Sequence, residues 1–375
     1  MKAKIFLGLA LLIIITSVCF SPGFSSNPIP EENNFSVIAY YHGNAAGIDD
    51  YPVEKLTHII FSFLHLKGNK LAVDNAKDSL TIQHLVSLKK RNPGLKIILS
   101  LGGWGGCETC SEVFANDQQR RQFAESVKQL LVQFKADGLD LDWEYPSIEG
   151  YPGHQYLPED KQNFTSLVQT LRTVFGNKYE LSFAAGAFTD CLKNSVEWNK
   201  IMPLLDKVNL MTYDLVNGYS KYTGHHTPLF SAPSQKESAD NAIRFLDSIG
   251  VERNKIIIGA AFYARVWENV EPSANSLFKP GKFKHGVDYK DLKKYFDDNK
   301  GFEHFWDSVA KAPYSYNAEK QLFATFDDER SITIKTRYAI KNDLGGIMFW
   351  QLGGDYHEKG LLDVIDKVKS EEKKK

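Results

Sequence analysis

Apolar residues along the chain gather in eight short runs that are rich in β-branched and aromatic side chains, as is typical of strands. These runs cover residues 35–41, 58–64, 96–103, 138–145, 180–188, 207–215, 255–267 and 345–352. Between most of them the apolar spacing changes to that of a helix. Eight strands alternating with helices predict a closed parallel (β/α)8 TIM barrel, with a doubly wound open sheet as the alternative.

Helical spacing is clearest in three of the intervening segments. The segment 117–138 begins with Asp117, a residue type common at helix N-caps, and the helix is expected to stop at Gly138. Its apolar positions are Phe123, Val127, Leu130, Leu131 and Phe134. Segments 158–176 and 238–250 repeat the arrangement and also end at glycine, so we expect all three to be outer helices of the barrel.

One interval, residues 268–326, is too long for a single crossover between two strands. It contains aromatic and strand-like pieces such as PYSYN and LFATF. We therefore expect a small α+β insertion between the seventh and eighth strands, within a catalytic domain that spans residues 34–368. Insertions at the C-terminal ends of barrel strands tend to form walls of a substrate site.

The first 25 residues have the layout of a secretory signal peptide, and we expect them to be removed. Two lysines precede an apolar run from Ile5 to about Ile15, which is too short to span a bilayer. A lipoprotein anchored at Cys19 is the alternative, although Val18 stands where a small residue is expected. The mature protein is therefore predicted to be secreted, either outside the cell or into a periplasm.

The composition is that of an ordinary globular protein, with 43% hydrophobic residues and a formal net charge of −1. This charge gives no reason to expect a surface that binds nucleic acid or a membrane. We also expect the protein to be a monomer. Because export permits disulfides, Cys107 and Cys110 can close a local disulfide, or they remain two idle thiols. No second ligand pair supports a zinc site, and Cys191 is left over as a buried thiol.

The fourth apolar run reads DGLDLDWEYP from Asp137 to Pro146 and carries acids at every second position. Alternate side chains of a strand face opposite sides, so Asp140, Asp142 and Glu144 share the side toward the barrel axis. The apolar residues between them face the surrounding helices. The acidic row rises toward the C-terminal mouth, where barrel enzymes carry their chemistry, and Glu144 is its uppermost member.

Carboxylates held in a confined row repel one another, so at least one is expected to keep its proton near neutral pH. A protonated acid is what cleavage of a glycosidic bond needs at the leaving oxygen. A purely structural role would cost stability, because buried acids must be hydrogen-bonded or used. A metal site is the other functional interpretation, and no matching histidine supports it. We expect neither a metal nor a cofactor.

The stretch DGLDLDWEYP resembles the signature of family 18 glycoside hydrolases, the chitinases and their relatives. The resemblance runs from about Val37 to about Asp355. SLGGW at 100–104 is similar to the family's third-strand motif, and MTYD at 211–214 is similar to its sixth-strand motif. The expected insertion is similar to the one that deepens the groove in one chitinase subgroup.

The resemblance implies how the acidic row would work. Glu144 would be the general acid and base, while Asp142 would orient the N-acetyl group of the substrate and share a proton with Asp140 or Glu144. Family 18 is a recognised exception to the two-carboxylate scheme of most glycosidases, because the acetamide oxygen of the substrate is the nucleophile. This implies a 2-acetamido sugar and retention of configuration.

The resemblance also assigns residues around the sugar. Tyr213 would hydrogen-bond the acetamide, with Met211 and Asp214 beside it, and Trp350 would form the floor under the sugar at the cleavage point. Cis peptide bonds are implied at Ser62–Phe63, Glu144–Tyr145 and Trp350–Gln351.

Further candidates come from the ends of the strands. Arg265 matches the family's seventh-strand arginine, although Ala264 before it stands where the family usually has glycine. Trp104 is a candidate for stacking on a sugar ring. Tyr40 and Tyr41 end the first strand, so only one of them can face the axis, and we take Tyr41 as the candidate for substrate contact. Substrate contact and plain packing both stay open for Trp267, Trp306 and the pair His225–His226.

The prediction is a secreted chitinase that hydrolyses β-1,4 links in chitin or N-acetylglucosamine oligosaccharides. One alternative is an endo-β-N-acetylglucosaminidase that acts on glycoprotein glycans with the same machinery. The other is a chitin-binding lectin on the same barrel. Lectins of this family have typically lost the acid, whereas all three acids of the row are present here.

Overall fold

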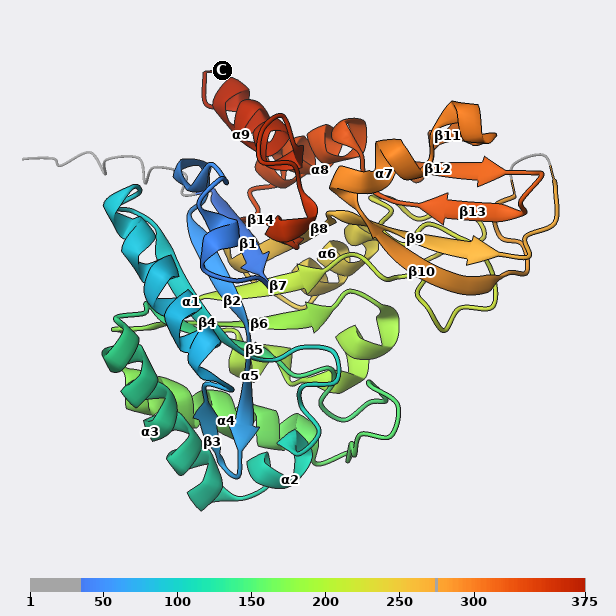
Figure 1. Ribbon diagram of the computed structural model, residues 1–375. Coiled ribbons are helices and arrows are strands. Elements are labelled where there is room, and N and C mark those ends of the chain that lie inside the picture. The colour runs from blue at the N-terminus through green and yellow to red at the C-terminus, as the bar shows by residue number, and fades with distance from the viewer. Residues whose placement is uncertain (1–34, 274–275, 375) are drawn as a thin grey trace, which may run out of the picture. The chain divides into compact units, whose positions relative to one another are not determined.

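The computed structural model describes residues 35–273 and 276–374. In this part of the chain, parallel strands form a closed barrel with helices outside it (Figure 1), which confirms the predicted (β/α)8 fold. The barrel strands are β1 (Ser36–Tyr41), β2 (His58–Lys67), β4 (Lys96–Gly102), β5 (Gly138–Asp142), β6 (Glu180–Gly186), β7 (Lys207–Met211), β8 (Ile256–Ala261) and β14 (Gly346–Trp350).

Strand β1 closes the barrel because it pairs in parallel with both β14 and β2. Ser36 lies opposite Gly346 in one ladder, and Ile38 lies opposite His58 in the other. The remaining barrel strands pair in chain order, and the short β3 (Lys70–Ala72) adds to β2 as an antiparallel partner. The open-sheet alternative is therefore wrong.

The barrel wall separates an outer apolar core from a smaller inner one. On β5, Leu139 and Leu141 belong to the outer core against the helices, and Trp143 just past the strand joins them. Asp140 and Asp142 face the other side, as the alternation predicted. The inner core consists of Ile38, Tyr40, Ile60, Ile98, Ala184, Met211, Tyr213, Ile257, Ala261 and Met348.

The three expected outer helices are present, with corrected ends. Helix α3 has Asn116 as its N-cap, whose side chain accepts from the backbone N–H of Gln119, so Asp117 is the first helical residue rather than the cap. The helix ends at Phe134, before Gly138, because Lys135 adopts the left-handed conformation. The helices are α1 (Ala76–Ser87), α2 (Cys110–Phe114), α3 (Asp117–Phe134), α4 (Asp160–Phe175), α5 (Trp198–Ile201), α6 (Ala239–Ser248), α7 (Tyr289–Tyr295), α8 (Glu329–Lys341) and α9 (Leu361–Glu372).

The expected insertion between the seventh and eighth barrel strands is a five-stranded antiparallel sheet with α7. Its strands pair in the order β10-β9-β13-β12-β11 (Figure 1). Their bounds are β9 (Tyr263–Glu268), β10 (Lys282–Asp288), β11 (Glu303–Asp307), β12 (Ala312–Asn317) and β13 (Leu322–Thr325). The sheet has apolar clusters of its own, and it begins at Tyr263, ahead of the expected start at residue 268.

The single strand expected over residues 255–267 is wrong, because the chain divides at Phe262 into β8 and β9. The backbone N–H of Phe262 donates to the carbonyl of Trp350 at 2.8 Å. Its ring stacks on Phe349, with centroids 4.1 Å apart. These contacts hold Phe262 in the outer core, and the chain then leaves the barrel for the second sheet.

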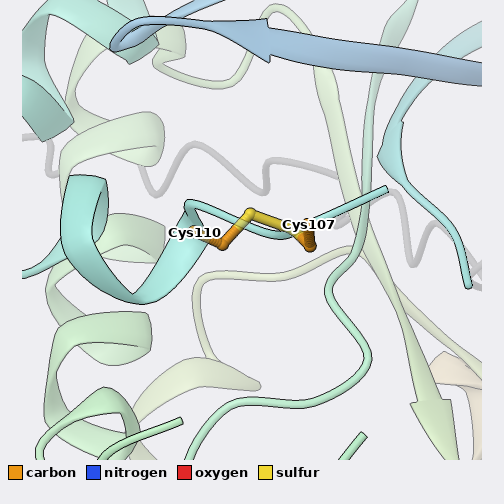
Figure 2. The surroundings of a disulfide bond; sticks show 2 residues. All are labelled: Cys107 and Cys110. Carbon is orange, nitrogen blue, oxygen red and sulfur yellow. A yellow bond between two sulfur atoms is a disulfide. The ribbon is translucent and has the colours of Figure 1, made fainter. Parts of the chain in front are cut away.

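Cys107 and Cys110 form a disulfide, which resolves the choice that the sequence left open. Figure 2 shows the bond joining the loop after β4 to the first residue of α2. Cys191 is free and buried, as expected. The proposed signal peptide, residues 1–25, lies outside the described residues. Within the described part, no helix is both long and apolar enough to span a bilayer.

Candidate active site

The acidic row lies at the C-terminal end of β5. Asp140 and Asp142 are both on the strand and buried, whereas Glu144 follows two residues after the strand ends. The expected strand 138–145 is therefore too long by three residues, because β5 ends at Asp142. Asp142 and Glu144 line one large cleft at the mouth of the barrel, and Asp140 lies beneath it.

Asp140 is anchored by four side chains from four other barrel strands. Its Oδ2 accepts hydrogen bonds from the hydroxyls of Tyr40 and Ser100, both at 3.0 Å. Its Oδ1 accepts from the Ser182 hydroxyl at 2.6 Å and from Nδ2 of Asn209 at 3.1 Å. Burial raises the pKa of Asp140, and these donors oppose the rise. The residue is therefore fixed in place at the bottom of the row.

The two upper acids hold protons more tightly than free carboxyl groups do. Burial raises the pKa of Asp142 well above its usual range, and the charges of Glu144 and Asp140 raise it further. The Oδ1 atom of Asp142 has no hydrogen-bond partner among the described residues. Burial and then the negative charge of Asp214 raise the pKa of Glu144 to about 7, although a hydrogen bond with Tyr145 opposes this. The row thus retains protons near neutral pH.

Asp214 carries the opposite preference and stays charged. Burial disfavours its charge, but His226 and Arg265 outweigh burial and hold its pKa below the usual range. Nε of Arg265 donates to Oδ1 of Asp214 at 2.7 Å, and a second guanidinium nitrogen donates to Oδ2, so the pair is bidentate. The Arg265 guanidinium also lies over the ring of Tyr263, 5.3 Å from its centroid. This arrangement places a fixed negative charge near the protonated Glu144.

Trp350 ends β14, is half-buried and lines the cleft. Phe63 stacks against it, with ring centroids 5.5 Å apart and planes 11° apart. Tyr40 lies 6.0 Å from the same indole at a tilted angle. Two neighbouring rings therefore restrict the indole, which gives a rigid apolar surface of the kind on which sugar rings stack.

The cleft has a volume of about 1760 Å³ and runs between the barrel loops and the insertion. Phe283 and Val287 of β10 contribute to the insertion's side of the cleft. Every expected site residue except Asp140 and Tyr41 lines it. Those lining residues are Glu144, Asp142, Tyr213, Trp350, Met211, Asp214, Arg265 and Trp104.

Tyr213 and Met211 project from the end of β7 into the inner core and the cleft. The Tyr213 hydroxyl donates to Sδ of Met348 at 3.8 Å, a weak contact that leaves the phenol free to bond a ligand. Burial raises the pKa of Tyr213 well above its usual range, and nearby charges add to the rise. The phenol is therefore a neutral donor at any ordinary pH.

Trp104 stands at the rim, 47% exposed, between two other exposed rings. Its indole makes edge contact with Tyr151 at 5.6 Å and lies 6.1 Å from Tyr219. These two tyrosines come from the loops after β5 and β7. The rim of the cleft thus presents a cluster of rings to solvent.

Tyr41 is not placed to contact a substrate. It lies in the outer core, and its hydroxyl donates to the carbonyl of Asn44 at 2.6 Å. Its neighbour Tyr40 takes the inward position instead and lines the cleft. The sequence does not reveal which of two neighbouring tyrosines at a strand end faces the barrel axis. The expectation that Tyr41 contacts the substrate is therefore wrong.

The remaining open candidates are all placed by the structure. Trp267 is fully buried within the insertion, so it packs rather than stacks on a ligand. The guanidinium carbon of Arg330 lies 3.9 Å from the centroid of the Trp306 ring, and Trp306 does not line the cleft. His225 and His226 are both fully buried, with His225 beside Asp307 and His226 beside Asp214.

Residues that sequence reasoning missed share one signal, which is the alternation of their strands. Asn209 has the same parity on β7 as Met211 and Tyr213. Ser100 and Ser182 are polar positions within the apolar middle of β4 and β6. Inward polar residues on neighbouring strands therefore mark the partners of Asp140. His226, for which the sequence left substrate contact and packing open, lies in a loop, so alternation gave no signal of its place beside Asp214.

Cis peptide bonds are present at Ser62–Phe63, Glu144–Tyr145 and Trp350–Gln351, which confirms that expectation. Among the residues that the structure describes, no group of three or more His, Cys, Asp or Glu side chains is arranged to hold a metal ion.

Comparison with known proteins decides the family. The pattern of the family described as Glycosyl hydrolases family 18 matches residues 36–355, which is most of the chain. The chain belongs to this family. The match extends over all eight barrel strands, including the acidic row and the insertion.

Relatives in family 18 include curated enzymes and solved structures. Chitinase A1 of Niallia circulans is 31% identical, over 94% of this chain and 61% of that protein, so the chain spans about three fifths of this relative's length. A family 18 N-acetylglucosaminidase from Paenibacillus barengoltzii is 34% identical over 89% of this chain and all of that one, with a TM-score of 0.81. A mutant of Ostrinia furnacalis Group II chitinase catalytic domain 2, in complex with penta-N-acetylchitooctaose, is 25% identical. It covers 89% of this chain and 96% of its own length, with a TM-score of 0.81.

Proposed function

We propose that this protein is a chitinase that hydrolyses β-1,4 links of N-acetylglucosamine polymers with retention of configuration. The observation that carries the proposal is Glu144, a carboxyl group at the mouth of the cleft whose pKa is raised to about 7. Such a group is protonated when it meets the glycosidic oxygen and can recover its proton from water afterwards. A lectin has no need of this acid.

In the first step, the acetamide oxygen of the bound sugar attacks the anomeric carbon while the bond to the leaving oxygen breaks. Glu144 transfers its proton to that oxygen and becomes a carboxylate. In the second step, water attacks the anomeric carbon from the face that the leaving group vacated, and Glu144 takes its proton. The acetamide oxygen returns to its carbonyl form, so the product keeps the β configuration.

The neighbouring residues have proposed roles in the same steps. Asp142, whose Oδ1 has no hydrogen-bond partner among the described residues, orients the acetamide and stabilises the positive charge that develops on it. Tyr213 donates to the acetamide oxygen, which its neutral phenol allows. Asp140, Met211, Asp214 and Arg265 position these groups, and Trp350 and Trp104 stack on sugar rings.

The polymeric substrate is supported by the volume of the cleft and by the names of the relatives. A cleft of about 1760 Å³ is larger than the usual range for small-molecule sites. Chitinase A1 is a curated relative, and another relative of known structure binds a chitooligosaccharide. A second candidate function is that of an N-acetylglucosaminidase, which the name of one relative of known structure favours. The endo-acting form of this activity, on glycoprotein glycans, remains the alternative.

Export through a signal peptide over residues 1–25 is part of the proposal, with the catalytic domain over residues 34–368 and the insertion over residues 268–326 within it. The disulfide between Cys107 and Cys110 supports an oxidising destination. We propose a monomer with no cofactor, no metal and no nucleic-acid partner.

The test is to incubate the protein with colloidal chitin and, separately, with a high-mannose glycoprotein, and to identify the released sugars. Chitooligosaccharides from chitin are the expected result. Release of the glycan from the glycoprotein alone would favour the endo-glucosaminidase, and single N-acetylglucosamine units as the first product would favour the exo-acting enzyme. Binding to chitin with no released sugar would favour the lectin.

A further inference from the structure

The residues that line the cleft include His42 and His65, and the proposed mechanism uses neither of them. The ring of His65 already has a partner, because its Nδ1 lies 2.5 Å from a carboxyl oxygen of Asp74. His42 is exposed and directly follows the last residue of β1. No acidic side chain in the described part of the chain pairs with it. The His42 ring is therefore available to a molecule that enters the cleft.

One hydrogen bond fixes which ring nitrogen of His42 carries the hydrogen. Nδ1 lies 2.9 Å from the carbonyl oxygen of Ser62. A carbonyl oxygen can only accept, so Nδ1 is the donor in this contact. In the neutral ring, Nε2 is then a hydrogen-bond acceptor. No described residue donates to it.

The side-chain amide of Gln351 is oriented in a similar way. Its Oε1 accepts hydrogen bonds from the backbone N–H groups of His42 and Gly353, both at 3.3 Å. Because both partners are donors, the oxygen of the amide and not its nitrogen must face them. Gln351 also lines the cleft, and its Nε2 group offers two N–H donors that bond to no described acceptor.

These two side chains stand together beside Trp350. The His42 ring lies 6.4 Å from the indole at a tilt of 35°, so it borders the indole and does not cover its face. Gln351 follows Trp350 in the chain, and the hydrogen bond from the His42 N–H keeps the two polar residues side by side. An acceptor and a donor, each oriented by backbone groups, therefore border the indole that is the proposed stacking surface for a sugar.

We propose that His42, together with Gln351, determines specificity by binding one free hydroxyl of the sugar chain where the chain passes the β1 side of Trp350. A hydroxyl both donates and accepts, so it can donate to Nε2 of His42 and accept from the amide of Gln351. The contact selects chains in which this hydroxyl is free over chains in which it is absent or capped as an ether. This inference rests on the proposed function, because it names a substrate contact in the same cleft.

The main experiment measures kcat/KM on methylumbelliferyl chitobioside and on analogues that each lack one of its free hydroxyls. The variant is His42→Asn, whose amide can still donate to the Ser62 carbonyl but has no acceptor at the position of Nε2. On the parent substrate it is expected to lose about threefold to tenfold, the usual effect of one hydrogen bond. On one of the analogues it is expected to lose almost nothing, because the partner hydroxyl is already gone. An equal loss on the parent and on every analogue would overturn the proposal, since a merely distorted cleft gives that result.

Gln351→Glu tests the second half of the contact. The carboxylate keeps an oxygen for the two backbone N–H groups but replaces the amide donor with another acceptor. It is expected to weaken kcat/KM on the parent and to spare the same analogue as His42→Asn. If the two variants spared different analogues, the two side chains would not share one hydroxyl and the proposal would be wrong.

His84→Ala is the control, because this histidine bonds Asp49 at 2.7 Å and does not line the cleft. Its kcat/KM is expected to stay within about twofold of wild type on the parent and on each analogue. A loss on the parent as large as that of His42→Asn, again with one analogue spared, would refute the specific role of His42.

Calorimetry distinguishes a failure of this inference from a failure of the proposed function. If the chain binds chitobiose without cleaving chitooligosaccharides, the proposed function fails. The Kd values of wild type and His42→Asn for chitobiose and its deoxy analogues then decide the contact, and one analogue should again be spared. If the chain cleaves the parent but all losses are equal, the proposed function stands and this inference fails. Neither binding nor cleavage would overturn both.

Discussion

The hydroxyl of Tyr40 donates a hydrogen bond to Oδ2 of Asp140 at 3.0 Å, although 100 residues separate the two along the chain. Tyr40 lies on β1 and Asp140 lies on β5, so the hydrogen bond crosses the interior of the barrel. Asn209 of β7 donates to both residues. This buried network fixes the lowest acid of the row, and in the proposed mechanism the upper acids Asp142 and Glu144 exchange the proton.

Glu144→Gln is expected to remove turnover and to leave oligosaccharide binding largely intact. The amide keeps the shape of the side chain but cannot deliver a proton, and loss of a general acid lowers the rate by about 10²–10⁴-fold. The measurements are kcat on a chitooligosaccharide and Kd by calorimetry. Glu125→Gln, on the exposed face of α3, is the control and should retain activity. Activity of Glu144→Gln within a few-fold of wild type would show that the acid is misassigned.

The basic limb of the pH profile is expected near pH 7. Burial and then Asp214 raise the pKa of Glu144 from 4.5 to about 7, and the protonated form acts first, so kcat/KM falls as pH rises through about 7. Asp214→Asn removes the second cause and should move this limb to lower pH. A wild-type limb near pH 4.5, the ordinary value for a glutamate, would contradict the assignment.

The raised pKa of Glu144 also makes the stability of the fold depend on pH. The folded protein binds the Glu144 proton more tightly than the unfolded chain does, so this contribution to the free energy of unfolding is fully present below about pH 4.5. It is lost as pH rises through about 7.

The acetamide requirement gives a third prediction. Fully deacetylated chitosan should bind in the cleft, because stacking on Trp350 does not need the acetyl group, but it should not be cleaved at an appreciable rate. Proton NMR of fresh chitooligosaccharide digests should show the β anomer before mutarotation. An initial α product, or equal cleavage of deacetylated chains, would rule out the substrate-assisted mechanism.

Lys335→Met is expected to destabilise the fold strongly. Nζ of Lys335 donates to both carboxyl oxygens of the buried Asp327, at 2.8 and 2.7 Å, so the variant leaves a carboxylate buried without its cation. Breaking such a pair costs about 3–5 kcal/mol of unfolding free energy, measured by urea denaturation. Adding Asp327→Asn should recover part of the loss, because the charge disappears.

Lys341→Met, on the exposed end of the same helix, is the control and should change little. A loss at Lys335 no greater than at Lys341 would contradict the prediction.

Much of this architecture was predictable because it follows from local periodicity. The alternation in DGLDLDWEYP placed Asp140 and Asp142 inside the barrel and Leu139 and Leu141 against the helices, since successive side chains of a strand must face opposite sides. The break in the strand and helix rhythm likewise predicted the insertion.

Contacts between distant segments were decided only by the tertiary structure. Tyr40 and Tyr41 are equally apolar neighbours, so their own strand does not tell which one turns inward. The structure places Tyr40 in the inner core and Tyr41 in the outer core. The run 255–267 reads as one strand, yet Phe262 divides it because its ring stacks on Phe349.

The sequence by itself determined the barrel, the inward row of acids and the family, because each is encoded in the spacing and identity of neighbouring residues. Only the tertiary structure brought Asn209 to Asp140 and His226 to Asp214. The physical reason is that charge and burial depend on groups from several strands and loops at once. The pKa of Glu144 therefore belongs to the folded cleft and not to the motif that contains it.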